Sequence, residues 1–151
     1  MNVEARLSEL GLALPPVVPP VASYVPATRI GNLVYTAGQL PMVQGSLVAA
    51  GKVGAAVAPE QAKELAQICA LNAIAAAGTV CNVDEIDRVI KVVAFIASAP
   101  GFNGQPGVAN GASELFGSVF GENGKHARSA VGVPELPLDA PVEVEVIFSV
   151  R

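Results

Sequence analysis

The chain has 151 residues and a net charge of −4 at pH 7, and 52% of its residues are hydrophobic against only 15% charged. Its nine Lys and Arg residues form no cluster, which argues against nucleic-acid binding, because that binding uses clustered cations to displace phosphate counterions. The longest apolar stretch, residues 68–80, is too short and too interrupted to span a membrane. The length predicts one domain with a substantial core. A mean hydropathy of +0.51 then indicates a chain that hides apolar surface in a homo-oligomer.

The cysteine content and the N-terminus indicate a cytoplasmic protein. Cys69 and Cys81 are too few for a disulfide scaffold. The N-terminal residues carry charges of both signs, and four prolines interrupt the apolar stretch that follows, so no signal peptide is visible. We therefore expect reduced thiols in the cytoplasm.

The first 20 residues predict a short helix and an extended arm. Val3, Leu7 and Leu10 have helical spacing over residues 2–10. The four prolines of the next segment exclude a helix and favour an extended chain. We therefore predict an N-terminal helix and proline-rich arm over residues 1–20, followed by a single domain over residues 21–151.

The middle of the chain predicts two hairpins and a long helix. Residues 29–37 (RIGNLVYTA) contain a Gly-Asn turn followed by β-forming residues, and residues 42–54 indicate a second, glycine-rich hairpin. Pro59 suits the first turn of a helix, whose face of small apolar residues continues until Gly78. The small side chains on that face would let a sheet approach closely.

The second half predicts a buried strand, a helix and a C-terminal hairpin. Residues 88–97 (RVIKVVAFIA) form the clearest buried strand, residues 98–107 are a loop rich in Gly and Pro, and a helix follows over residues 108–120. The element order indicates an α+β fold, with a single mixed sheet backed by two helices on one face. The other face of the sheet is then free to meet further subunits.

Two charged residues stand out in the C-terminal segment. Arg128 opens one apolar β-run and Glu143 lies within the next, and we expect the two runs to pair as a hairpin around residues 134–141. A charge in so apolar a run needs a partner. Arg128 could bind a carboxylate or phosphate with two parallel hydrogen bonds, or form a structural ion pair, or simply be exposed. Glu143 could hold or activate a water, while Glu145 on the same face is by default solvated.

Other candidate residues are weaker on sequence alone. Tyr24, after the proline arm, could line a cleft or anchor the arm, and Gly38 at a strand end allows close approach of a ligand or a turn. His126 is the only histidine, so any Ser-His or Cys-His pair must use it. Zinc-ligand spacing, the P-loop and the G-x-G-x-x-G pattern are all absent from the sequence. We expect no metal and no cofactor.

The motifs G-N-L-V-Y-T-A-G-Q-L-P (31–41) and A-R-S-A-V-G-V-x-x-L-P…V-E-V-E (127–145) resemble those of the Rid (YjgF/RidA) family. The resemblance covers roughly residues 20–150. It implies a fold like that of chorismate mutase, and a homotrimer with a β-barrel-like core and ligand clefts between subunits. The activity that it implies is hydrolysis of reactive 2-imino acids, or their enamine tautomers, to 2-oxo acids and ammonia.

The resemblance also implies roles for individual residues. Arg128 falls on the arginine that clamps the substrate carboxylate, and Glu143 on the acid that positions water. Tyr24, Gly38 and Asn110 fall on residues that line the cleft. A small anionic carboxylate is the implied ligand.

Some features set this chain apart from archetypal members and indicate a divergent subgroup. Val-Pro-Ala follows Tyr24, Ala130 stands where those members often carry cysteine, and the N-terminal arm and the 98–109 loop are extra or longer. One alternative stays open, a trimer that binds a 2-oxo acid without turnover and has a regulatory or sensing role. Ribonuclease activity, also associated with the family, is disfavoured by the acidic charge.

Overall fold

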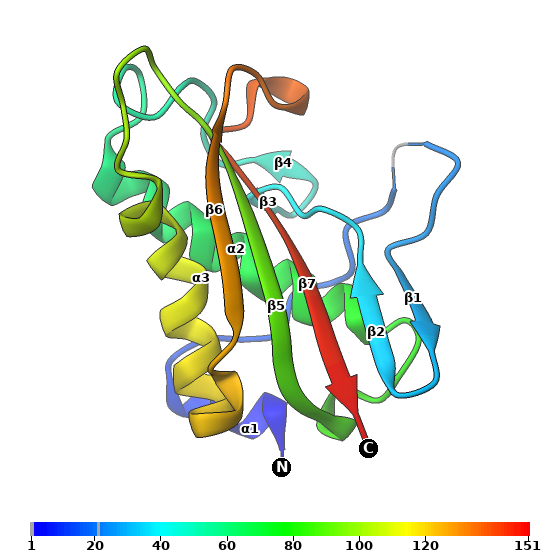
Figure 1. Ribbon diagram of the computed structural model, residues 1–151. Helices are drawn as coiled ribbons and strands as arrows, with labels where there is room; N and C mark the ends of the chain where they lie inside the picture. Colours follow the sequence, from blue (N-terminus) through cyan, green and yellow to red (C-terminus); the bar gives the residue numbers. More distant parts are fainter. Residues whose placement is uncertain (1, 21) are drawn as a thin grey trace.

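The structure, a computed structural model, describes residues 2–20 and 22–151; Met1 and Val21, the end residues of the predicted arm and domain, lie outside the described residues. The described part has an α+β fold (Figure 1). Its helices and strands are α1 (Val3–Glu9), β1 (Ala27–Ile30), β2 (Leu33–Thr36), β3 (Met42–Val43), β4 (Ser46–Leu47), α2 (Pro59–Ala77), β5 (Ile86–Ala97), α3 (Gln105–Phe120), β6 (Ala127–Val133) and β7 (Val142–Val150). Short 3₁₀ helices lie between these elements: η1 (Val83–Glu85), η2 (Gly121–Gly124) and η3 (Pro137–Asp139).

One mixed sheet dominates, with strand order β1-β2-β7-β5-β6. The β5–β6 pair is parallel and the other pairs are antiparallel. Helices α2 and α3 pack together against the sheet, and in Figure 1 α2 crosses behind the strands while α3 lies beside β6, so the predicted fold class is confirmed. The strands β3 and β4 form a separate small hairpin, shorter than predicted.

The core lies between this sheet and the two helices. On β7, Val142, Val144, Val146 and Phe148 face the helices, as the alternating pattern predicts. The buried face of α2 consists largely of alanine, which lets α2 approach both the sheet and α3. Among the described residues, no helix combines the length and apolarity that a membrane span requires.

The predicted C-terminal hairpin is wrong, because β5 lies between β6 and β7. Strand β5 pairs with β6 on one side and with β7 on the other. The segment β5–α3–β6 is a crossover that returns parallel to its starting strand, a connection that packs its helix onto the sheet. Strand β5 is also the longest in the sheet, and an apolar strand of 12 residues is best buried between two neighbours.

Helix α3 begins at Gln105, three residues before the predicted start. Pro106 lies in its first turn, where a missing N–H is harmless. This proline was assigned to the preceding loop but is part of the helix. The loop between β5 and α3 is correspondingly shorter.

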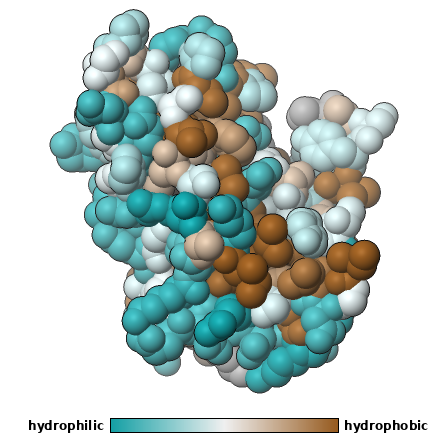
Figure 2. Space-filling view, in the orientation of Figure 1, coloured by the Kyte–Doolittle hydropathy of each residue, from teal (hydrophilic) through white to brown (hydrophobic). Residues whose placement is uncertain are grey.

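The face of the sheet away from the helices is partly apolar. Figure 2 views the molecule from the same side as Figure 1 and shows hydrophobic residues gathered on part of this face. Large exposed apolar side chains of the strands include Ile30, Tyr35, Ile90 and Val131. Since such patches commonly mark protein interfaces, this face is suited to meet other subunits.

Candidate functional site

The first half of the candidate site surrounds Arg128. Arg128 is the second residue of β6 and pairs with the buried Val92 of β5, so its side chain projects toward the helices. There its Nη1 donates to Asn110 Oδ1 at 2.7 Å and to Ser113 Oγ at 3.2 Å. Asn110 and Ser113 lie one turn apart on α3 and therefore share a face. Helix and strand together hold one edge of the guanidinium.

Among the described residues, no carboxylate lies within ion-pair distance of Arg128. Its partners are a neutral amide and a hydroxyl, so no carboxylate within the described residues offsets the charge of the guanidinium. The structural ion pair considered for Arg128 is therefore not formed within the described part of the chain. An unneutralised guanidinium at the sheet edge is suited to bind an anion.

The second half of the site surrounds Glu143, near the start of β7. Gly38 lies against its carboxyl group, so that a Cβ added at Gly38 would lie 2.8 Å from Glu143 Cδ. Glu143 is half-buried, and burial raises the pKa of its carboxyl, with a further contribution from the nearby charge of Glu145. A carboxyl with a raised pKa is better able to exchange protons near neutral pH.

A cavity of about 230 Å³ opens beside Glu143, Gly38 and Tyr24. Its walls are mostly apolar and come from the proline arm, the segment after Gly38 and the η3 turn: Val18, Pro19, Pro20, Leu40, Met42 and Leu138. Tyr24 thus lines this cavity, and the arm closes one side of it. The cavity offers room for a small molecule with an apolar part.

The two halves do not meet within one chain. Arg128 pairs with Val92 and Glu143 pairs with Phe95, which is three residues further along β5. Positions an odd number of residues apart on a strand face opposite sides, so Arg128 is on the helix face and Glu143 on the uncovered face. The expectation that a hairpin would bring them onto neighbouring strands is wrong, because β5 separates β6 from β7. Asn110 joins the Arg128 half; Tyr24 and Gly38 join the Glu143 half.

Two residues of the Arg128 half were not among the predicted site residues: Ser113, and His126, which was considered only as a possible partner of a nucleophile. Ser113 Oγ lies 2.8 Å from His126 Nε2, and His126 Nδ1 lies 2.6 Å from the carbonyl oxygen of Gly124. Burial lowers the pKa of His126, against the hydrogen bond to Gly124, which raises it. Asn110 and Ser113 are three residues apart on one helix, and His126 and Arg128 are two residues apart at the start of one strand. These spacings predict a shared site only when it is known that α3 packs against β6.

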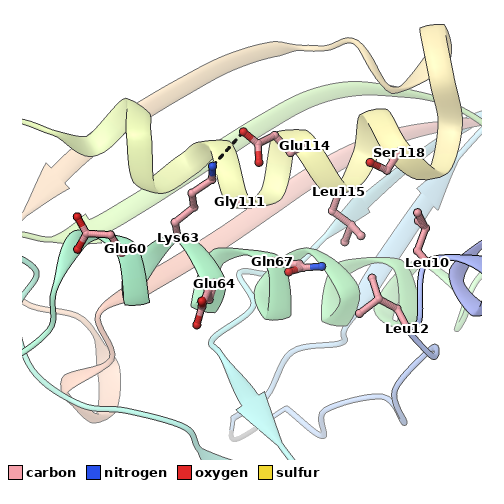
Figure 3. A pocket seen from close by; sticks show the side chains of 10 residues that line it. All are labelled: Leu10, Leu12, Glu60, Lys63, Glu64, Gln67, Gly111, Glu114, Leu115 and Ser118. Atoms are coloured by element: carbon pink, nitrogen blue, oxygen red, sulfur yellow. Dashed lines mark hydrogen bonds and ion pairs between the residues drawn. The ribbon is translucent and has the colours of Figure 1, made fainter.

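A larger groove of about 550 Å³ runs between α2 and α3 (Figure 3). An ion pair between Lys63 and Glu114, at 3.1 Å, links the two helices across it. Because Glu60 and Glu64 add further negative charge, this groove is unsuited to an anion. No cluster of three His, Cys, Asp or Glu side chains that could hold a metal ion occurs in the described ranges.

Comparisons with known proteins cover both halves of the site. The family described as Endoribonuclease L-PSP matches residues 15–150. Protein TCP17 of Trypanosoma cruzi is 39% identical to the chain, over 99% of this chain and 95% of its own length. The 2-iminobutanoate/2-iminopropanoate deaminase of Dermatophagoides farinae is 32% identical, over 87% of this chain and 89% of its own. The crystal structure of protein Atu1372 from Agrobacterium tumefaciens has a TM-score of 0.91 and 44% identity, covering 99% of this chain and 92% of that one.

Proposed function

Since this chain belongs to the Endoribonuclease L-PSP family, also called the Rid (YjgF/RidA) family, we propose that it hydrolyses 2-imino acids, or their enamine tautomers, to 2-oxo acids and ammonia. The observation that carries the proposal is the guanidinium of Arg128, which has only neutral partners among the described residues. The name of the D. farinae relative, a 2-iminobutanoate/2-iminopropanoate deaminase, supports the substrate class.

In the proposed reaction, Arg128 binds the substrate carboxylate with two parallel N–H···O bonds. Water attacks the imine carbon, and Glu143 accepts one of its protons and delivers it to the imine nitrogen. The hydroxyl proton of the resulting carbinolamine then passes to the amino group, the C–N bond breaks and ammonia leaves. Burial raises the pKa of Glu143, so one carboxyl can both accept and donate the proton. Such positioned acid–base help is worth ~10²–10⁴-fold in rate.

We further propose that the active site forms between subunits of a homotrimer. Arg128 and Glu143 lie on opposite faces of one sheet, so a complete site needs Arg128 from one chain and Glu143 from another. The partly apolar uncovered face supports such an assembly, since burying it would remove exposed Ile30, Tyr35 and Val131 from water. The trimer's ligand clefts would then join the two halves.

The cavity beside Glu143 favours a substrate with an apolar side chain. Its walls offer the side chains of Leu40, Met42 and Leu138 together with the proline arm. A volume of about 230 Å³ exceeds what a methyl group needs. We therefore expect imines derived from leucine or methionine to be better substrates than the imine derived from alanine.

The test is a competition assay. An amino-acid oxidase generates the 2-imino acid, semicarbazide traps what remains, and wild type is compared with Arg128→Ala at equal concentration. Wild type should lower the trapped product, while Arg128→Ala should not. Arg6→Ala is the matched control, because it removes an exposed arginine on α1 that lines neither half of the site. A loss of trimer or of folding in Arg128→Ala would make Arg128 a structural residue and refute the proposed site.

A second candidate is a trimer that binds a 2-oxo acid without turnover. The observation in its favour is that the Arg128 half is complete without Glu143. Glu143→Gln distinguishes the two: an enzyme loses turnover, whereas a binding protein keeps its affinity for 2-oxobutanoate. RNA cleavage is disfavoured by the net charge of −4, and RNA cleavage that stays with the trimer through purification would revive it.

A further inference from the structure

Arg128 is one end of a chain of three hydrogen bonds. Its Nη1 donates to Ser113 Oγ at 3.2 Å, Ser113 Oγ lies 2.8 Å from His126 Nε2, and His126 Nδ1 lies 2.6 Å from the carbonyl oxygen of Gly124. A carbonyl oxygen can only accept, so His126 Nδ1 carries a proton. In the neutral ring Nε2 is then an acceptor, and the Ser113 hydroxyl donates to it. The donor and the acceptor of each of these three hydrogen bonds are therefore assigned.

The surroundings of His126 keep its ring neutral and fixed. Burial, chiefly, and then the charge of Arg128 lower its pKa, against the hydrogen bond to Gly124, which raises it. The ring packs edge-on against Phe116, with centroids 6.0 Å apart. The neighbouring Lys125 forms an ion pair with Glu122, at 2.8 Å, and Ser113 and Gly117 of α3 line a small pocket together with His126 and Arg128.

We propose that Ser113 and His126 are positioning residues that orient the guanidinium of Arg128 for the substrate carboxylate; this proposal rests on the proposed function. Asn110 and Ser113 both accept from Nη1, which fixes the plane of the guanidinium. Among the described residues, no acceptor is bonded to Nε or Nη2, so these two groups can form the parallel pair with a carboxylate. The backbone carbonyl of Gly124 holds His126, at the far end of this series of hydrogen bonds.

Without the Ser113 hydroxyl, Arg128 keeps Asn110 alone and its guanidinium can rotate. Ser113→Ala removes both bonds of the hydroxyl, and His126→Phe keeps the aromatic contact with Phe116 but removes the acceptor. His126→Gln restores an acceptor that reaches the position of Nε2. If His126 orients the Ser113 hydroxyl, His126→Phe should impair substrate binding as Ser113→Ala does, and His126→Gln should restore it. If the hydroxyl only fills space, the two His126 variants should bind substrate as wild type does.

The kinetic test measures KM and kcat for imine hydrolysis. Ser113→Ala and His126→Phe should each raise KM about five- to tenfold, as expected for the loss of one hydrogen bond of ordinary strength, with kcat within twofold of wild type. His126→Gln should recover most of the loss. A purely structural network would lower Tm in these variants without changing KM, and that result would overturn the proposal.

A second measurement does not depend on turnover, and its first part needs only the wild-type protein. His126 is the only histidine, so ¹⁵N NMR of the uniformly labelled wild type gives a single imidazole. At pH 7.5 it should show the Nδ1–H tautomer, and the Nε2–H tautomer would overturn the proposal. Adding 2-oxobutanoate should shift these signals in wild type but not in Arg128→Ala.

If wild type has the Nδ1–H tautomer but neither hydrolyses imines nor responds to 2-oxobutanoate, the proposed function fails and the positioning role fails with it. If wild type hydrolyses imines while Ser113→Ala keeps the wild-type KM, only the positioning role fails.

Discussion

The contact between Gly38 and Glu143 makes a quantitative prediction for Gly38→Ala. The added Cβ would lie 2.8 Å from Glu143 Cδ and 3.0 Å from Cγ, and closer still to one carboxyl oxygen. Carbon atoms in contact normally stay about 3.5–4.0 Å apart. The carboxyl must therefore move by about 1 Å. A displacement of that size at a catalytic group costs about 10²-fold in rate.

The same substitution should leave the fold intact. The φ of Gly38 is not positive, so alanine can adopt its backbone conformation without strain. The group that must move is the end of a half-buried side chain rather than backbone. Replacing glycine where the backbone permits it stabilises a protein by about 0.4–1 kcal/mol through the unfolded chain. We expect Tm to stay within about 4 °C of wild type, since 1 kcal/mol corresponds to about 2–4 °C for a chain of this size.

Imine hydrolysis and thermal unfolding are measured together, with Gly107→Ala as the control. Gly107 lies in the first turn of α3, is exposed, and an added Cβ would meet nothing within 4 Å, so this variant should match wild type in turnover and keep or slightly raise its Tm. Wild-type turnover in Gly38→Ala would refute the requirement for a fixed Glu143 carboxyl. A fall in Tm of 10 °C or more would instead make Gly38 a packing residue.

Three further predictions concern stability. Gly111→Ala places a Cβ on α3 2.8 Å from the Lys63 carbonyl carbon in the backbone of α2, so it should cost about 2–3 kcal/mol; an unchanged Tm would contradict this. Asn72→Ala removes the buried amide that donates to two backbone carbonyls of residues 40 and 42, at 3.1 and 3.0 Å, and should cost about 2 kcal/mol in urea unfolding; a loss below about 0.5 kcal/mol would mean that water replaces the amide. Glu143→Gln should stabilise the fold at pH 7, because a raised folded-state pKa costs stability once the carboxyl is ionised, and this gain should vanish as pH falls below the ordinary value of 4.5. An equal gain at pH 4 and pH 7 would show that burial of the charge is not the cause.

Local sequence rules were sufficient for several elements. The Gly31-Asn32 turn predicts the β1–β2 hairpin, and Gly31 indeed has a φ of 56°, which glycine adopts readily. Pro59 and Gly78 bracket α2, which ends at Ala77. The alternation along β7 assigns its two faces correctly. Each of these features depends on neighbours in the chain, so composition and spacing contain the information.

The placement of β6 could not be derived in this way. Both β6 and β7 are apolar runs joined by a short segment, and such a pattern is equally compatible with a hairpin and with two strands that flank a third. The outcome depends on β5, which gains from burial between two neighbours, and on α3, which carries the chain back parallel to β5. These are long-range energies that no local window records.

The candidate site shows the same division. By itself, the sequence determined that Arg128 and Glu143 are unusual charges in apolar strands, because burial of a charge is costly wherever the strand lies. Only the tertiary structure decided that they face opposite sides of one sheet, and that Ser113 of α3 and His126 reach Arg128. Strand order and helix placement set these contacts. Both result from the competition of all the elements for burial in one core, which no single segment determines.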